Sequence, residues 1–154
     1  MYYDNHGGYH YRGEADRDRC MNIDQGPAPY TADIWEMAVK NNNFRTTIWT
    51  GCHLQMTLMS IPVCGDVGTE IHEDTDQMLR VEQGNALVKM KRNEDRSEYM
   101  KKLSQGDGIF VPAGTKHNII NIGNIPLKLS SVYAPPHHPR GTIHHTKADA
   151  ENEM

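Results

Sequence analysis

Short apolar runs, each ended by glycine, proline or charged residues, fill the chain from residue 44 onward. The runs are rich in Thr, Ile, Val, Leu and Met, a composition typical of β-strands. Nine strands at this spacing predict an all-β fold, an antiparallel sandwich or barrel. The predicted strands cover residues 44–50, 54–61, 69–72, 77–83, 85–91, 98–103, 108–112, 117–122 and 127–133.

The segments between and after these strands have a different composition. The charged residues 91–98 are expected at an exposed hairpin tip, and the proline-rich residues 134–141 are expected to end the sheet region. The pattern therefore predicts one barrel over residues 44–135, followed by a His/Pro-rich tail over residues 136–154.

The residues before the barrel predict an arm and one short helix, together residues 1–43. Residues 1–29 are rich in Tyr, Gly, His, Asp and Arg and have too few aliphatic side chains for a core element. A helix is expected to begin at Thr31 as its N-cap and to pack outside the barrel. Its apolar stripe consists of Ile34, Trp35, Ala38 and Val39.

A second short helix is expected in the tail. Thr146 and Asp149 have the spacing of a capping box ahead of the last residues. The whole prediction is thus an all-β barrel with an N-terminal arm, one short helix before it and a short C-terminal helix.

Composition excludes several classes of partner. The 154 residues carry 16 Lys and Arg against 20 acidic residues, without the basic block that neutralises a phosphate backbone. No apolar run approaches the ~20 residues that span a bilayer, and the polar N-terminus lacks the apolar core of a signal peptide. We therefore expect a cytoplasmic protein that binds neither nucleic acid nor membrane. Cys20, Cys52 and Cys64 show no metal or disulfide spacing and are expected to be reduced, buried side chains.

Two stretches suggest a metal site. Glu70 and His72 lie two residues apart, so on a strand they point to the same side. An inward carboxylate needs hydrogen-bond partners or a metal ion. His117 begins a later predicted strand and can supply a third ligand.

These stretches resemble the paired motifs of the cupin superfamily, which are double-stranded β-helix (jelly-roll) barrels. In the second motif, Gly106, Pro112, Gly114, His117 and Asn121 all occur at the family's spacing. In the first motif, His72 and Gly84 keep their places. Glu70 stands at a position where the family has histidine, and Gln77 stands where it has glutamate.

The resemblance implies a shell of Glu70, His72, Gln77 and His117 around one divalent transition metal, which could be Zn, Fe, Mn, Ni or Co. The alternative is a barrel in which Glu70 and Gln77 form hydrogen bonds without a metal. A homodimer is also what the resemblance implies.

Small cupins of this general appearance are similar to mannose-6-phosphate isomerase-like proteins. That similarity implies isomerisation of a sugar or sugar phosphate. Because Gln77 cannot accept and return a proton, Glu70 is expected as the catalytic residue, and water bound at His72 or a histidine of the tail are the alternatives. Substrate contacts are expected from Lys116, Tyr133, His138 and Arg140. Two alternatives stay open: a non-haem iron dioxygenase and a non-enzymatic metal-dependent small-molecule binding protein.

Overall fold

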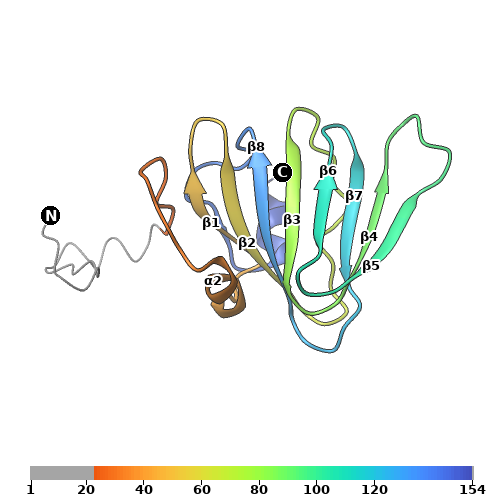
Figure 1. Ribbon diagram of the computed structural model, residues 1–154, viewed down its shortest axis with the longest axis horizontal. Coiled ribbons are helices and arrows are strands. Elements are labelled where there is room, and N and C mark those ends of the chain that lie inside the picture. The colour runs from red at the N-terminus through yellow and green to blue at the C-terminus, as the bar shows by residue number, and fades with distance from the viewer. Residues whose placement is uncertain (1–22, 154) are drawn as a thin grey trace, which may run out of the picture.

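The structure is a computed structural model that describes residues 23–153. Its strands form two antiparallel sheets, which make the two layers of a jelly roll (Figure 1). The larger sheet has the order β6-β3-β8-β2-β1-β9, and the smaller has the order β5-β4-β7. The strands are β1 (Arg45–Thr50), β2 (Gln55–Ile61), β3 (Asp76–Gln83), β4 (Ala86–Lys91), β5 (Tyr99–Leu103), β6 (Gly108–Val111), β7 (Lys116–Asn121), β8 (Leu127–Ala134) and β9 (Ile143–His144).

The predicted all-β fold is confirmed, and eight of the nine predicted runs form strands β1 to β8. The charged segment 91–98 connects the antiparallel pair β4 and β5, as expected of a hairpin tip. None of the helices in residues 23–153 is long and apolar enough to cross a membrane.

The interior between the sheets has an apolar part and a polar part. Inward side chains of β2, β3, β6, β7 and β8 form one buried apolar cluster that includes Met59, Leu79, Val81 and Leu129. Other inward positions of the larger sheet carry polar side chains instead. Examples are Arg45, Thr47, Gln55, Thr57, Gln77, Ser131 and Tyr133, each at most 5% exposed. The apolar part stabilises the barrel, and the polar part lies where a ligand could be held.

Helix α2 (Ile34–Lys40) packs on the outer face of the larger sheet, as predicted. Ala38 is fully buried against Ile48 and Leu58. The expected stripe is only partly correct, since Trp35 is 49% exposed. The predicted N-cap is wrong: the cap is Asp33, whose side chain accepts a hydrogen bond from the Glu36 N–H. Both Thr and Asp are good N-caps, so composition alone could not choose between them.

Replacing Asp33 by Ala should destabilise the protein by about 1 kcal/mol, because the first turn of α2 loses the acceptor of its N–H group. Thr31→Ala is the matched control and should change the free energy of unfolding by less than about 0.5 kcal/mol, as is usual for surface substitutions. Urea unfolding followed by circular dichroism measures both. Equal decreases in the free energy of unfolding of the two variants would contradict the assignment of Asp33 as the N-cap.

Helix α3 (Lys147–Asn152) begins with the predicted capping box. The Thr146 side chain accepts from the Asp149 N–H, and the Asp149 side chain accepts from the Thr146 N–H. The expectation that the sheet ends at the proline-rich segment is wrong, because β9 in the tail pairs with β1. The tail therefore contributes the last strand of the larger sheet.

Two further expectations need correction or completion. Cys52 and Cys64 are exposed free thiols and not the buried side chains expected, while Cys20 lies outside the described residues. Residues 1–22 of the arm also lie outside, but its end runs along β1. There Gln25 N–H donates to the Ile48 carbonyl, and buried Asp24 accepts from the Thr50 hydroxyl.

Candidate metal centre

The segment that carries Glu70 and His72 was expected to be a strand, but it forms only an isolated bridge at Glu70. The main chains of Glu70 and His117 exchange two hydrogen bonds of 2.9 Å each. The Gly114 N–H donates to the His72 carbonyl at 2.8 Å. The loop is therefore held against β7 and its preceding turn, which brings residues more than forty positions apart into contact.

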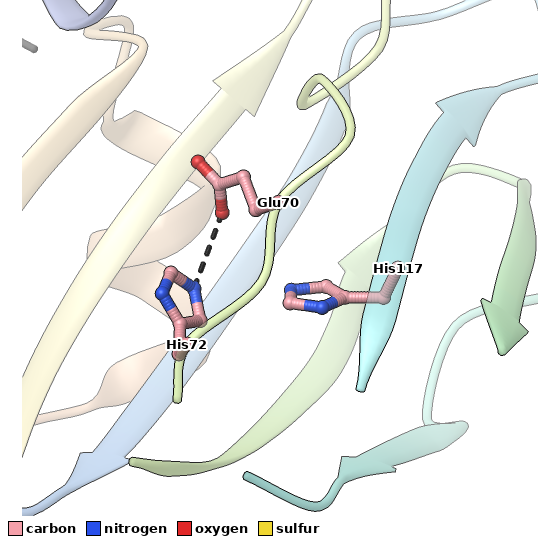
Figure 2. A group of neighbouring side chains, drawn as sticks. All are labelled: Glu70, His72 and His117. Atoms are coloured by element: carbon pink, nitrogen blue, oxygen red, sulfur yellow. Dashed lines mark ion pairs between the residues drawn. The ribbon is translucent and has the colours of Figure 1, made fainter. Parts of the chain in front are cut away.

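Three side chains converge at this point. Ligand atoms of Glu70, His72 and His117 all lie within 4.8 Å of one another. Figure 2 shows Glu70 and His72 projecting from one loop, with His117 pointing toward them from β7. Glu70 Oε2 lies 3.3 Å from His72 Nε2. Two atoms bound to one ion at ~2.1 Å each are about 3.0–3.4 Å apart at usual coordination angles, so this pair is spaced for a shared metal.

The histidine nitrogens fit the role of metal ligands. Within residues 23–153, both ring nitrogens of buried His72 and Nε2 of His117 have no hydrogen-bond partner. His117 Nδ1 lies 2.9 Å from the Thr115 carbonyl, which only accepts, so Nδ1 carries the proton and Nε2 keeps its lone pair. Buried polar atoms without partners are costly, and a metal ion would satisfy them.

The charge states also suit a metal. Burial tends to raise the pKa of the Glu70 carboxyl, but His72 and Arg45 together lower it below its usual value. Burial lowers the pKa of His117. At neutral pH the site thus presents a carboxylate and a neutral imidazole, the forms that bind metal.

Gln77, the fourth expected ligand, points inward from β3 and is 5% exposed. Its Nε2 donates to the Ser131 hydroxyl at 2.9 Å, which fixes the amide orientation. Its Oε1 is buried and lacks a hydrogen-bond partner among the described residues. Ligation by Gln77 stays a prediction that these contacts support. Asp76, the neighbouring residue, is exposed, as expected from strand alternation.

Tyr133, one of the expected substrate residues, lies beside the candidate ligand His72, and His138, another, lies beside Tyr133. The Tyr133 ring is fully buried, 5.7 Å from the His72 ring. The His138 ring stands edge-on to Tyr133 at 5.2 Å. Burial, with a smaller contribution from the Arg45 guanidinium, lowers the pKa of His138 to about 2. His138 is therefore a neutral side chain at any physiological pH.

The other two expected substrate residues are placed differently. Lys116 is exposed at the start of β7. Arg140 donates to the Asp24 carbonyl at 3.2 Å, so its guanidinium binds the end of the N-terminal arm. The structure brings neither cation into the group formed by Glu70, His72 and His117.

Two residues near the ligands were not predicted as site residues. His137 has its ring 4.1 Å from the His72 ring, and burial and His72 lower its pKa. Arg45 is 2% exposed, and its Nη2 lies 3.7 Å from Glu70 Oε1. In the sequence, His137 is distinguished only as one of several histidines in the tail. The only unusual feature of Arg45 in the sequence is that it is a single charged residue within a predicted strand that is otherwise uncharged.

Comparisons with known proteins agree with this fold. The sequence pattern of the cupin domain matches residues 57–133, half of the chain. The protein YrkC of Bacillus subtilis (strain 168) is 48% identical over 145 residues, which cover 94% of this chain and 78% of YrkC. A protein of Acanthamoeba polyphaga mimivirus is 40% identical over 115 residues, covering 74% of this chain and 70% of its own.

A solved structure is similar over most of its length. The crystal structure of BH2720 from Bacillus halodurans is 49% identical, with a TM-score of 0.82, and the match covers 84% of this chain and 98% of that one. The names of these proteins state no reaction, so the comparisons show family and fold. The chain belongs to the cupin domain family.

Proposed function

We propose that this protein binds one divalent transition metal through Glu70, His72 and His117 and acts on a sugar or sugar phosphate as an isomerase. The observation that carries the metal is the set of three ligand atoms within 4.8 Å of one another. Both ring nitrogens of His72 and Nε2 of His117 have no hydrogen-bond partner in the described part of the chain. Zn, Fe, Mn, Ni and Co all accept two imidazoles and a carboxylate, so the metal's identity stays open.

Isomerisation of a hydroxy aldehyde to a hydroxy ketone needs an electrophile at the two adjacent oxygens and a base. The base takes a proton from the carbon that bears the hydroxyl and returns it to the former carbonyl carbon. A divalent ion bound at this site would supply the electrophile. The ring of Tyr133 and the neutral ring of His138 lie beside the ligands and would exclude water around the substrate. These two residues support the predicted substrate role, whereas Lys116 and Arg140 receive no support from their positions.

The base must come from the residues around the ligands. Glu70 is the base predicted from the sequence, but its lowered pKa makes it a weaker base than an ordinary carboxylate. His137 is a second candidate because of its position: its ring lies 4.1 Å from that of His72, and it is not one of the three proposed metal ligands. Its pKa is lowered too, but the neutral imidazole can accept a proton. We propose that His137 moves the proton while Glu70 holds the metal.

The experiment is an exchange assay with mannose 6-phosphate and fructose 6-phosphate, using protein loaded in turn with each candidate metal. We expect the two sugars to approach equilibrium. His137→Asn should lower kcat by about 100-fold or more while the bound metal is retained, because loss of a general base has effects of this size. His53→Asn, at an exposed site, is the matched control. Absence of exchange with every metal would contradict the isomerase.

A non-haem iron dioxygenase is the second candidate, and one observation favours it. Two histidines and one carboxylate are the ligand set of Fe(II) oxygenases, which keep open positions on the metal. Oxygen uptake by the Fe(II)-loaded protein with an enediol, in the absence of sugar exchange, would select this reaction. If both assays are negative, the non-enzymatic binding protein is the remaining reading.

The homodimer and the cytoplasmic location expected from the sequence stay predictions. One surface feature supports the dimer: Phe110 of edge strand β6 is 72% exposed. Large apolar side chains at a sheet edge are commonly covered by another subunit.

A further inference from the structure

Strand β1 carries a guanidinium group with two unused donors into the barrel interior. Arg45 is 2% exposed, and its Nη1 lies 3.0 Å from His144 Nδ1. Its Nε and Nη2 are buried and have no hydrogen-bond partner in residues 23–153. Arginine is always charged and only donates, so a buried edge of this kind is costly unless an acceptor meets it.

Glu70 does not fully satisfy this edge. Nη2 is 3.7 Å from Glu70 Oε1, which is too long for a hydrogen bond, and Nε has no partner at all among the described residues. The ion pair explains why a charged arginine is tolerated beside the site. It leaves the donors themselves available for a ligand.

Two hydroxyl groups extend the same wall. Thr47 follows Arg45 by two positions on β1 and therefore shares its face, and Thr57 is the direct partner of Thr47 on β2. Thr47 is 1% exposed and Thr57 0%. The Oγ1 atoms of both, within the described part of the chain, lack hydrogen-bond partners. Guanidinium and hydroxyls thus form one buried patch of donors.

The charge of the occupied site favours an anion. Arg45 contributes one positive charge and Glu70 one negative charge, and a divalent ion would leave an excess of two positive charges. The neighbouring His138 is neutral, since its pKa is lowered to about 2 by burial. A positive site of low dielectric attracts and holds an anionic ligand more strongly than a neutral one.

We propose that Arg45, Thr47 and Thr57 bind the carboxylate of a small hydroxy or oxo acid whose adjacent oxygen reaches the metal. Nε and Nη2 lie on one edge of the guanidinium, and this planar fork matches the two oxygens of a carboxylate. The Arg45 guanidinium lies 3.7 Å from Glu70, a proposed metal ligand. A carboxylate bound by Arg45 would therefore lie close to the metal, as in an acid whose carboxylate is next to the oxygen that binds the metal. The assignment rests on the proposed metal centre and not on the proposed reaction. Among sugars it favours sugar acids over the sugar phosphates of the exchange assay, so failure of that assay alone would leave it standing.

The test is calorimetric titration of Zn(II)-loaded protein with glycolate, inorganic phosphate and glycerol. We expect glycolate to bind, and glycerol to bind at least about tenfold more weakly, because it lacks the charge. Thr47→Val and Thr57→Val should each weaken glycolate about tenfold or more, the usual effect of losing a hydrogen bond to a charged group. Neither should change Zn(II) affinity. These near-isosteric variants avoid the folding problem that a change at buried Arg45 could cause.

Thr46→Val is the matched control, because Thr46 points to the other face of β1 and bonds Asn41. If phosphate binds more tightly than glycolate and the same two substitutions weaken its binding, the assignment of a carboxylate as the ligand would be overturned. Failure of metal-loaded protein to bind glycolate would overturn the carboxylate site while leaving the metal centre intact. The affinity for Zn(II) and for each other candidate metal is measured first, and absence of binding by all of them would overturn both proposals.

Discussion

Replacing His117 by Ala should remove the bound metal. The substitution takes away one of three protein ligands, and its Nε2 is the atom that the Thr115 contact leaves free for the ion. Loss of outer-shell partners alone costs ~10- to 100-fold in metal affinity, so loss of a ligand should cost more than about 100-fold. Glu70→Ala should act similarly and should also leave Arg45 without its ion pair.

Competition with a chromophoric chelator, together with elemental analysis of protein purified without chelators, measures this effect. His53→Ala is the control, because His53 is exposed and does not belong to the group of Glu70, His72 and His117. Gln77→Ala tests the predicted fourth ligand: an amide oxygen is a weak ligand, so its loss should matter less than that of His117. Full retention of metal by both the His117 and Glu70 variants would contradict the site.

The metal should also stabilise the fold. A ligand that binds only the native state adds about 2.7 kcal/mol at a concentration 100 times its Kd. The wild-type melting temperature should therefore rise with metal, and that of the His117 variant should not. A metal bound at the site raises the melting temperature of the wild type alone, whereas a loosely associated metal would affect both proteins equally.

The sequence predicted most strands because each strand of the barrel carries its own signal. Short β-branched runs, ended by turn residues, are local features, and β1 to β8 follow them closely. The prediction of a strand at residues 69–72 was wrong for the opposite reason. Its two ligands are held by a single bridge to His117 and by Gly114, contacts that lie more than forty residues away in the chain.

The contacts of Arg45 could not be predicted from the sequence. Its partner His144 lies 99 residues away, and β9 pairs with β1 through only two residues. A two-residue strand after a proline-rich segment has almost no periodicity, so neither the strand nor its contact with Arg45 could be predicted. The motif spacing predicted the positions of the candidate ligands, whereas the side chains around them depend on which strands become neighbours.

Leu129→Ala should be among the most destabilising single changes in this chain, at about 3 kcal/mol. Leu129 is fully buried in central strand β8, opposite Met59 of β2 and Val81 of β3. Truncating a leucine in such a position removes apolar contact on both sides and leaves a cavity, which costs ~2–5 kcal/mol. Val132→Ala on the same strand is the control, since Val132 is only partly buried, and it should cost less than about 1.5 kcal/mol.

Urea unfolding of metal-free protein measures both changes, and the m-value should stay constant if only native packing is altered. The Leu129 variant should keep its metal affinity, because Leu129 belongs to the apolar cluster and the ligands do not. The His117 variant should lose the metal, whatever the removal of a side chain that is only 3% exposed costs the metal-free stability. If Leu129→Ala weakened metal binding as strongly as His117→Ala, the apolar core and the metal centre would be coupled, and the division of the interior into two parts would be wrong.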